Sequence, residues 1–487
     1  MGIDNFHTWL RQKFPGSYIP IKTNNIYEYI YIDVNFILHN SIYGCKTEND
    51  FIKKLYLQLD IIFANFIATK KIFFSLDGPS SFAKIILQRK RRTMTSDKVN
   101  KNAISSLYIT PGIEPMKRIE TYLKTYVDKL KTNYRFINPD TYMSSSNEPD
   151  EGEIKICYEV IKNGLSNLNH RHLIIGNDSD LIALSMGMKP IHNINILVKG
   201  KSENQLISLT KLLQLHCKNI NRLDKIEKLS ISTLRNDFVV ISIMMGNDYL
   251  PKLGYVKHEK LWKIYYDLIR SLHENETLMN DDYTFNDCIM KKFMFNAYNS
   301  LSNGFKKVGV DTYNDVRSKS YLEGILWCLK MYQTGKCPQY NYSYIGKIAP
   351  HPYELLFHLH AEKEITLKES NYQPIPAEIY SLIIMPKNAS YLIPKKYHNL
   401  MNHELKYLYE MEECVKCIQY KLNIKTINRQ IKECNETNET NEDEVNIIKD
   451  KYKQNFNEYM CHRKTHNKCF NANDINKIIE LANKIKI

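Results

Sequence analysis

The stretch Tyr29-Ile30-Tyr31-Ile32-Asp33 is a short apolar run that ends on an aspartate. Two further runs of this kind are residues 71–77, Lys-Ile-Phe-Phe-Ser-Leu-Asp, and residues 172–178, His-Leu-Ile-Ile-Gly-Asn-Asp. Such runs, rich in Ile, Tyr and Phe, predict buried strands. Residues 51–69 and 153–163 lie between them and predict helices. This alternation predicts an α/β fold with a mostly parallel sheet flanked by helices.

The overall charge points to a class of partner. The 487 residues include 67 Lys and Arg against 53 Asp and Glu, which gives a formal net charge of +14. A positive surplus attracts polyanions such as nucleic acids, although it would equally serve solubility alone. The 11 cysteines fall at irregular positions, and no apolar run is long enough to span a membrane. We therefore expect a protein of the cytoplasm, with the nucleus as the alternative, and no membrane partner.

Acidic residues end the predicted strands. Because the carboxyl ends of parallel strands meet at one edge of a sheet, we expect these side chains to lie close together. The acids at strand ends, before a predicted helix or after the helical stretch 237–245 are Asp33, Asp77, Glu151, Glu153, Asp178, Asp180 and Asp248. Singly, each is as well explained as a turn residue or a helix cap. Together they would repel one another unless a cation were bound, and oxygen ligands select Mg²⁺ or Mn²⁺.

A basic segment follows Asp77 directly. On a helix, Lys84, Gln88, Arg91 and Arg92 fall at i, i+4, i+7 and i+8 and share one face. A terminal phosphate carries more charge and more free oxygens than an internal one, so this face beside a metal site predicts recognition of a phosphorylated end. The alternative is a solvated basic helix, or a nuclear localisation run through residues 89–92.

Aromatic residues offer a second kind of contact. His39 follows the first predicted strand, and Tyr340 and Tyr342 belong to an alternating aromatic segment. Such rings can stack on bases without reading their identity. Packing inside the protein explains each of them equally well.

Two groups of cysteine and histidine raise the question of zinc. Cys414 and Cys417 lie in a helical run, and Cys461, His462, His466 and Cys469 are irregularly spaced. Because the first pair sits in a predicted helix and the second group is irregularly spaced, the sequence disfavours a structural zinc site.

Taken in order, the motifs resemble those of the XRN family of 5′→3′ exoribonucleases. The resemblance covers about the first four hundred residues. It includes Met1-Gly2-Ile3, Asp33-Val34-Asn35, Asp77-Gly78, Ile109-Thr110-Pro111-Gly112, Glu151-Gly152-Glu153, Asp178-Ser179-Asp180, Gly246-Asn247-Asp248, Gly335-Lys336-Cys337-Pro338 and Leu392-Ile393-Pro394.

The resemblance implies a PIN/FEN-like nuclease that degrades 5′-monophosphorylated single-stranded RNA processively to nucleoside 5′-monophosphates, as in mRNA decay. The seven acids would hold two Mg²⁺ or Mn²⁺ ions. Lys84, Gln88, Arg91 and Arg92 would bind the 5′-phosphate, and His39 with Tyr340 or Tyr342 would stack on a base. We expect a monomer, and its protein partners are unknown. The tyrosines replace the family's usual tryptophans, which leaves the identity of the stacking ring open.

The resemblance also implies a division of the chain. We expect a nuclease domain at 1–255, a largely helical second region at 256–410 that completes the substrate channel, and a helical charged tail at 411–487. A linker is predicted near 434–444, and the tail does not resemble the family. Two alternatives remain: a structure-specific, flap-type DNA nuclease, and an RNA-binding scaffold without catalytic activity.

Overall fold

The computed structural model describes most of the chain. The described residues are 3, 5–21, 25–96, 104–132, 139–198, 204–220, 231–272, 276–311, 314–346, 348–361, 365–367, 370–410, 414–436, 442–466 and 470–485. By their contacts they divide into two units, Met1–Pro394 and Lys395–Ile487. This division does not address the boundaries predicted at 255 and 410, which stay predictions.

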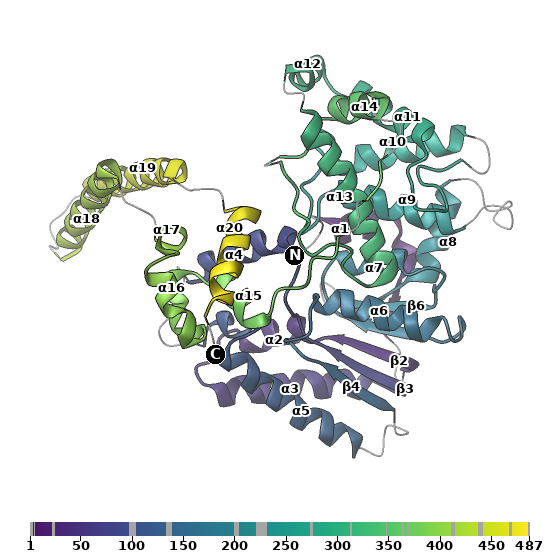
Figure 1. Cartoon of the computed structure of the whole chain (residues 1–487), viewed down its shortest axis with the longest axis horizontal. Coiled ribbons are helices and arrows are strands. Elements are labelled where there is room, and N and C mark those ends of the chain that lie inside the picture. Colours follow the sequence, from purple (N-terminus) through teal and green to yellow (C-terminus); the bar gives the residue numbers. More distant parts are fainter. Residues whose placement is uncertain are drawn as a thin grey trace. The chain divides into compact units, whose positions relative to one another are not determined.

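The first unit is built on one sheet of seven strands (Figure 1). The strands are β1 (Tyr18–Pro20), β2 (Asn25–Asp33), β3 (Phe66–Ser75), β4 (Asp140–Ser144), β5 (His172–Ile175), β6 (Ile194–Val198) and β7 (Gln205–Ser208). Their order is β1-β7-β6-β5-β2-β3-β4. Strands β2 to β6 pair in parallel, and β7 and β1 add antiparallel pairs at one side. The predicted α/β fold with a mostly parallel sheet is confirmed.

Two of the predicted strand ends differ from the observed ones. β3 ends at Ser75 and β5 at Ile175, so Asp77 and Asp178 lie in the loops just beyond the strands. The helix predicted over 51–69 is wrong at its end, because α3 stops at Asn65 and β3 begins at Phe66. Residues 66–68 pair with 25–27 of β2, and this pairing between strands overrides the local helical pattern.

Helices surround the sheet and fill the rest of the first unit. They are α1 (Phe6–Lys13), α2 (Val34–Ile42), α3 (Glu48–Asn65), α4 (Phe82–Ser96), α5 (Glu114–Lys131), α6 (Gly152–Gly164), α7 (Asp180–Gly187), α8 (Leu209–Asn219), α9 (Ile231–Met244), α10 (His258–Ser271), α11 (Asp287–Asn299), α12 (Asn303–Asp311), α13 (Asp315–Thr334), α14 (Pro352–Ala361) and α15 (Ala377–Ile384). α9 is buried from Thr233 to Met244 and packs against α7 and α13, so it links the sheet layer to the helical region that follows.

The second unit is helical throughout its described residues. It contains α16 (His398–Asn402), α17 (Lys406–Tyr409), α18 (Val415–Glu436), α19 (Glu442–His466) and α20 (Ala472–Asn483). α18 and α19 lie side by side as a helical hairpin (Figure 1). Helix covers both ends of the linker predicted at 434–444, and residues 437–441 lie outside the described residues. None of the described helices combines the length and the apolar character that a membrane span requires.

Gly112 marks a close approach between two distant segments of the first unit. Its φ is +82°, and a Cβ there would lie 2.0 Å from the carbonyl oxygen of Ala377, at the start of α15. Gly44 has a similar φ of +74°, but a Cβ there would have no neighbour within 4 Å. The two glycines share the same backbone constraint, and only Gly112 adds a steric one.

These glycines give a matched pair of stability variants. We expect Gly44→Ala to lower the free energy of unfolding by roughly 1–2 kcal/mol, the cost of a left-handed backbone for alanine. Gly112→Ala should lower it further, because the Ala377 backbone would have to move. Thermal unfolding of the two purified variants measures the difference, and equal midpoints would contradict the close approach.

Candidate active site

Most of the predicted site residues line one cavity. This cavity of about 990 Å³ lies at the edge where the parallel strands end. The predicted residues that line it are Asp33, His39, Asp77, Lys84, Gln88, Arg91, Arg92, Glu151, Glu153, Asp178 and Asp248. The structure thus brings together six of the seven acids and all four residues of the basic face.

The strand and helix ends place these acids. Asp33 is the last residue of β2 and caps α2, where its side chain accepts the backbone N–H of Phe36 at 3.4 Å. Glu151 stands at the N-cap position of α6 and Glu153 in its first turn. Asp248 follows α9 in a turn that Asn247 stabilises by accepting the backbone N–H groups of Tyr249 and Leu250. Local capping and turn geometry therefore orient acids that come from distant parts of the chain.

Asp77 is held by two partners that sequence reasoning did not assign. Asn35 donates its side-chain amide to Asp77 Oδ2 at 2.7 Å and accepts the Asp77 backbone N–H at 3.1 Å. The backbone N–H of Gly152 donates to Asp77 Oδ1 at 2.7 Å. Asn35 is thus a positioning residue. Its place two positions after Asp33 was the available signal, but only the contact between α2 and the loop after β3 reveals its role.

Tyr249 was also missed. Its hydroxyl donates to Glu151 Oε1 at 2.6 Å, and its ring packs at 5.2 Å, centroid to centroid, from Trp327. Burial and the neighbouring Glu151 raise the pKa of Tyr249 well above its usual value, so the hydroxyl stays protonated and donates. A tyrosine beside Asp248 in the sequence gives no sign that it will contact Glu151.

Asp180 is the predicted acid that is not part of the cavity lining. It is 5% exposed and accepts the backbone N–H of Ile3 at 3.1 Å. Ser179 donates to the Ile3 carbonyl at 3.2 Å, so Ile3 packs next to the site. Met1 and Gly2 lie outside the described residues.

The buried acids repel one another. Burial, followed by Asp77 and Asp178, raises the pKa of Asp33 well above its usual value. Burial, followed by Asp178 and Asp33, does the same for Glu153. The pKa of Asp180 is likewise raised by burial and by Asp178. Two effects act in the same direction. Withdrawal from water and neighbouring negative charges both disfavour the charged form of a carboxyl group, so both raise its pKa.

The basic face balances part of this charge. Lys84 Nζ lies 2.6 Å from Asp248 Oδ2 and also pairs with Glu151, while Arg91 pairs with Asp248 at 2.9 Å. Burial raises the pKa of Asp248, but Lys84 and Arg91 lower it more, to about 2. Gln88 and Arg92 bond to each other at 3.0 Å. Helix α4 thus places two cations directly among the acids.

Arg92 is fixed by a second segment. Its Nε donates to Thr110 Oγ1 and its Nη2 to the Ile109 carbonyl, both at 3.0 Å. The segment 109–112 therefore orients one end of the guanidinium, while another part of the side chain lines the cavity. Two residues of the motif Ile109-Thr110-Pro111-Gly112 thus contact Arg92.

The three aromatic side chains predicted to stack on a base lie in different environments. His39 is exposed and lines the cavity. Tyr342 is 9% exposed, stacks on Trp327 at 4.9 Å between ring centroids, and donates its hydroxyl to the Ser320 carbonyl. The prediction that Tyr342 stacks on a base is therefore wrong, because its ring is buried in the protein core. Tyr340 bonds to Asp150 and is not among the described residues that line the cavity.

The donor set fits hard divalent cations. Asp178 Oδ1 is buried and has no hydrogen-bond partner among the described residues, as expected of an oxygen that serves a ligand. At Gly152, a Cβ would come within 3.2 Å of Asp77 Oδ1 and 3.5 Å of Asp33 Oδ1, so only a glycine leaves this space open. Carboxylate oxygens are the ligands that Mg²⁺ and Mn²⁺ prefer, and six of these acids line the same cavity.

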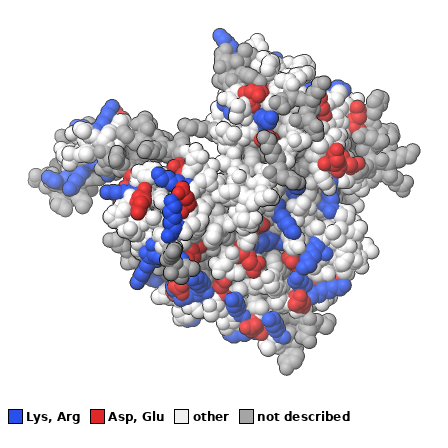
Figure 2. All heavy atoms as spheres, in the orientation of Figure 1, with Lys and Arg blue, Asp and Glu red and all other residues white. Residues whose placement is uncertain are grey.

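The surface charge outside the cavity is dispersed on the face that Figure 2 shows. Lys and Arg side chains are interspersed with Asp and Glu over its described residues. On this face the described basic side chains are therefore not gathered into one patch.

Comparison with known families agrees with the site. Residues 1–199 match the family described as "XRN 5'-3' exonuclease N-terminus". The N-terminal part of the chain is therefore similar to the N-terminal region of the XRN family. The matched part of the chain contains β1 to β6 and the acids from Asp33 to Asp180.

Curated relatives extend the match beyond residue 199. Human "5'-3' exoribonuclease 1" is 25% identical over 360 residues, which is 64% of this chain and 21% of the human protein. The Saccharomyces cerevisiae protein of the same name is 28% identical over 297 residues, 52% of this chain and 19% of the yeast protein. "5'-3' exoribonuclease 2" of Arabidopsis thaliana is 27% identical over 249 residues, 39% of this chain and 25% of that protein. The chain thus spans about a fifth to a quarter of the length of these relatives.

A solved structure gives a weaker likeness. The catalytic core of Rad2 in complex with DNA substrate covers 79% of this chain and 99% of its own, with 12% sequence identity and a TM-score of 0.36. A likeness at this level carries no conclusion about the substrate of this chain.

The charge arrangement predicts an unusual stability effect. In chelator, Asp178→Asn should raise the free energy of unfolding by about 1 kcal/mol, because it removes a like charge from the buried cluster. The variant should also lose most of the thermal stabilisation that Mg²⁺ gives the natural chain. The matched control is Asp128→Asn, at a side chain that is 73% exposed, which should change neither value. A less stable Asp178→Asn variant that still responds fully to Mg²⁺ would contradict the repulsion argument.

Proposed function

We propose that this chain is a metal-dependent 5′→3′ exoribonuclease that degrades single-stranded RNA from a 5′-monophosphate end. The proposal rests on one observation above all: six carboxylates and the basic face of α4 line the same cavity. The match of residues 1–199 to the XRN N-terminal family and the names of the relatives support it.

The acids would hold two Mg²⁺ or Mn²⁺ ions. The proposed ligands are Asp33, Asp77, Glu151, Glu153, Asp178, Asp180 and Asp248. When bound, a pair of such ions supplies an activated water and stabilises negative charge on the leaving oxygen of a phosphodiester. Asn35 and Tyr249 would keep Asp77 and Glu151 in orientation through the hydrogen bonds described above.

The basic face of α4 would bind the terminal phosphate. Arg91 and Arg92 offer planar guanidinium groups suited to two phosphate oxygens each, and Gln88 adds a neutral donor beside them. Lys84 lies between Glu151 and Asp248, and would bring a positive charge next to the scissile phosphate. His39, which is exposed in the cavity, is the proposed stacking partner of a base near the 5′ end.

This arrangement accounts for directional degradation. Water adds to the phosphorus of the first internucleotide linkage, and the bond from that phosphorus to the 3′ oxygen of the terminal nucleotide breaks. A nucleoside 5′-monophosphate leaves, and the shortened RNA again carries a 5′-monophosphate. The same basic face can bind each new end, which is the basis for proposing processive action. We also propose that the chain acts as a monomer, in the cytoplasm.

Substrates that differ only at the 5′ end provide the decisive test. We expect 3′-labelled single-stranded RNA with a 5′-monophosphate to be degraded to nucleotides in Mg²⁺. The same RNA with a 5′-hydroxyl or a cap should persist, because the basic face then lacks its ligand or is obstructed. Equal degradation of all three RNAs would contradict the proposal that the chain recognises a 5′-monophosphate. Cleavage confined to DNA flaps would favour a structure-specific DNA nuclease, and RNA binding without cleavage would favour a scaffold.

Arg92→Met tests the phosphate contact itself. Losing a charge-assisted hydrogen bond, worth roughly 1.5–3 kcal/mol, should reduce the preference for 5′-monophosphate over 5′-hydroxyl RNA by about 10- to 100-fold. The preference is a ratio of two rates in one preparation, so partial unfolding of the variant cancels. Lys90→Met removes a charge from an exposed position of the same helix and should leave the ratio unchanged. An unchanged ratio in Arg92→Met would remove this residue from the phosphate site.

A further inference from the structure

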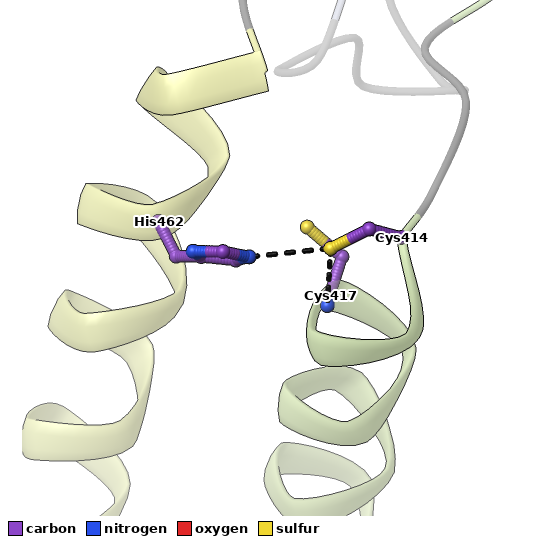
Figure 3. A group of neighbouring side chains, drawn as sticks. All are labelled: Cys414, Cys417 and His462. Carbon is purple, nitrogen blue, oxygen red and sulfur yellow. Dashed lines mark hydrogen bonds between the residues drawn. The ribbon is translucent and has the colours of Figure 1, made fainter.

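A second cluster of metal-ligand side chains lies in the unit formed by residues 395–487. Cys414 and Cys417 stand at the start of α18, and His462 stands near the end of α19. Figure 3 shows the His462 ring directed across the helical hairpin toward the two cysteines. The two sulfur atoms and a ring nitrogen all lie within 4.8 Å of one another. The sequence disfavoured zinc here, and the fold brings these three residues together.

The distances suit a tetrahedral zinc ion. Zn–S bonds of about 2.3 Å and Zn–N bonds of about 2.05 Å place sulfur and nitrogen about 3.6 Å apart at a tetrahedral angle. Cys414 Sγ lies 3.2 Å from His462 Nε2, so a small outward movement would admit the ion. The Cys414 sulfur also accepts the backbone N–H of Cys417 at 3.4 Å, which favours the thiolate form that binds metal.

The ligand types distinguish this cluster from the cavity of carboxylates. Thiolate and imidazole are soft or borderline ligands that select Zn²⁺, whereas Mg²⁺ and Mn²⁺ prefer oxygen. In a solution that contains both kinds of metal, the cysteines and His462 would therefore prefer Zn²⁺, and the acids of the cavity would prefer Mg²⁺ or Mn²⁺.

The hairpin has little apolar packing of its own. Among its described residues, Cys417, Ile427 and Tyr459 are buried, while Ile418 and Leu422 are 46% and 53% exposed. Pairs of helices with so small a core usually need a staple such as a metal ion to hold their geometry. Tyr420 packs against the His462 ring at 5.9 Å between centroids and would keep the imidazole in position.

We propose that Cys414, Cys417 and His462 bind one Zn²⁺ ion that ties the start of α18 to the end of α19. The ion has a structural role, since it would connect two helices that share few buried side chains. With three protein ligands, the fourth position of a tetrahedral Zn²⁺ ion would be taken by a water molecule.

Metal analysis of the full chain tests the site. The protein is purified under reducing conditions, loaded with ZnCl₂, and passed through a weak chelating resin before its metal content is measured. We expect about one Zn²⁺ per chain, with a tetrahedral thiolate spectrum after exchange for Co²⁺. Cys417→Ser and His462→Ala should each lose at least about 10-fold in affinity. Cys288→Ser, at an exposed cysteine of the other unit, is the matched control and should bind as the natural chain does.

Two further measurements guard against simple unfolding. His462→Cys keeps a soft ligand at the same position and should retain zinc and the Co²⁺ spectrum. A zinc-selective chelator, added in excess Mg²⁺, should increase proteolysis within 414–466, and added Zn²⁺ should reverse this. The proposal is overturned if the natural chain holds no zinc after the resin. It is also overturned if Cys417→Ser and Cys288→Ser hold equal amounts, or if the chelator leaves the cleavage pattern unchanged.

Discussion

The convergence of negative charge at one edge of the sheet is the constraint on which the first unit depends. Two unit charges 4 Å apart interact by about 4 kcal/mol at the effective dielectric of a protein near its surface, so a group of acids is a substantial opposing energy. The apolar core beneath them balances it, since Ile30, Tyr31 and Ile32 of β2 are completely buried just before Asp33. The apolar residues of β2 stabilise the strand, and its last residue, Asp33, is the one proposed to bind metal.

Because of this negative charge, the basic side chains of α4 have two roles. Lys84 and Arg91 neutralise Glu151 and Asp248, and they stand on the face that would receive a phosphate. A bound phosphate and the carboxylates would therefore both interact with Lys84 and Arg91. Binding of substrate in the cavity would then change how well the acids are neutralised. Arg92 differs because Ile109 and Thr110 hold it, so its guanidinium is oriented without an acid as partner.

Apolar runs and acids at their ends predicted the sheet and most of the residues that line the cavity. The residues that were not predicted correctly depend on contacts between distant segments of the chain. Acids at strand ends were predictable because chain direction alone places them at one edge. Asn35 and Tyr249 were not assigned, since their partners Asp77 and Glu151 come from distant segments of the chain. The wrong stacking role for Tyr342 has the same origin, because only tertiary packing shows that its ring is covered by Trp327.

The cysteine and histidine cluster shows most clearly why spacing alone can mislead. Zinc motifs are recognised by ligands a few residues apart, and here 44 residues separate Cys417 from His462. α18 and α19 have 22 and 25 residues, so each spans roughly 33–38 Å. When helices of nearly equal length fold back on each other, the start of the first meets the end of the second. Residues remote in sequence then become neighbours through geometry alone, and an ion between them would close the open end of the hairpin, opposite the turn.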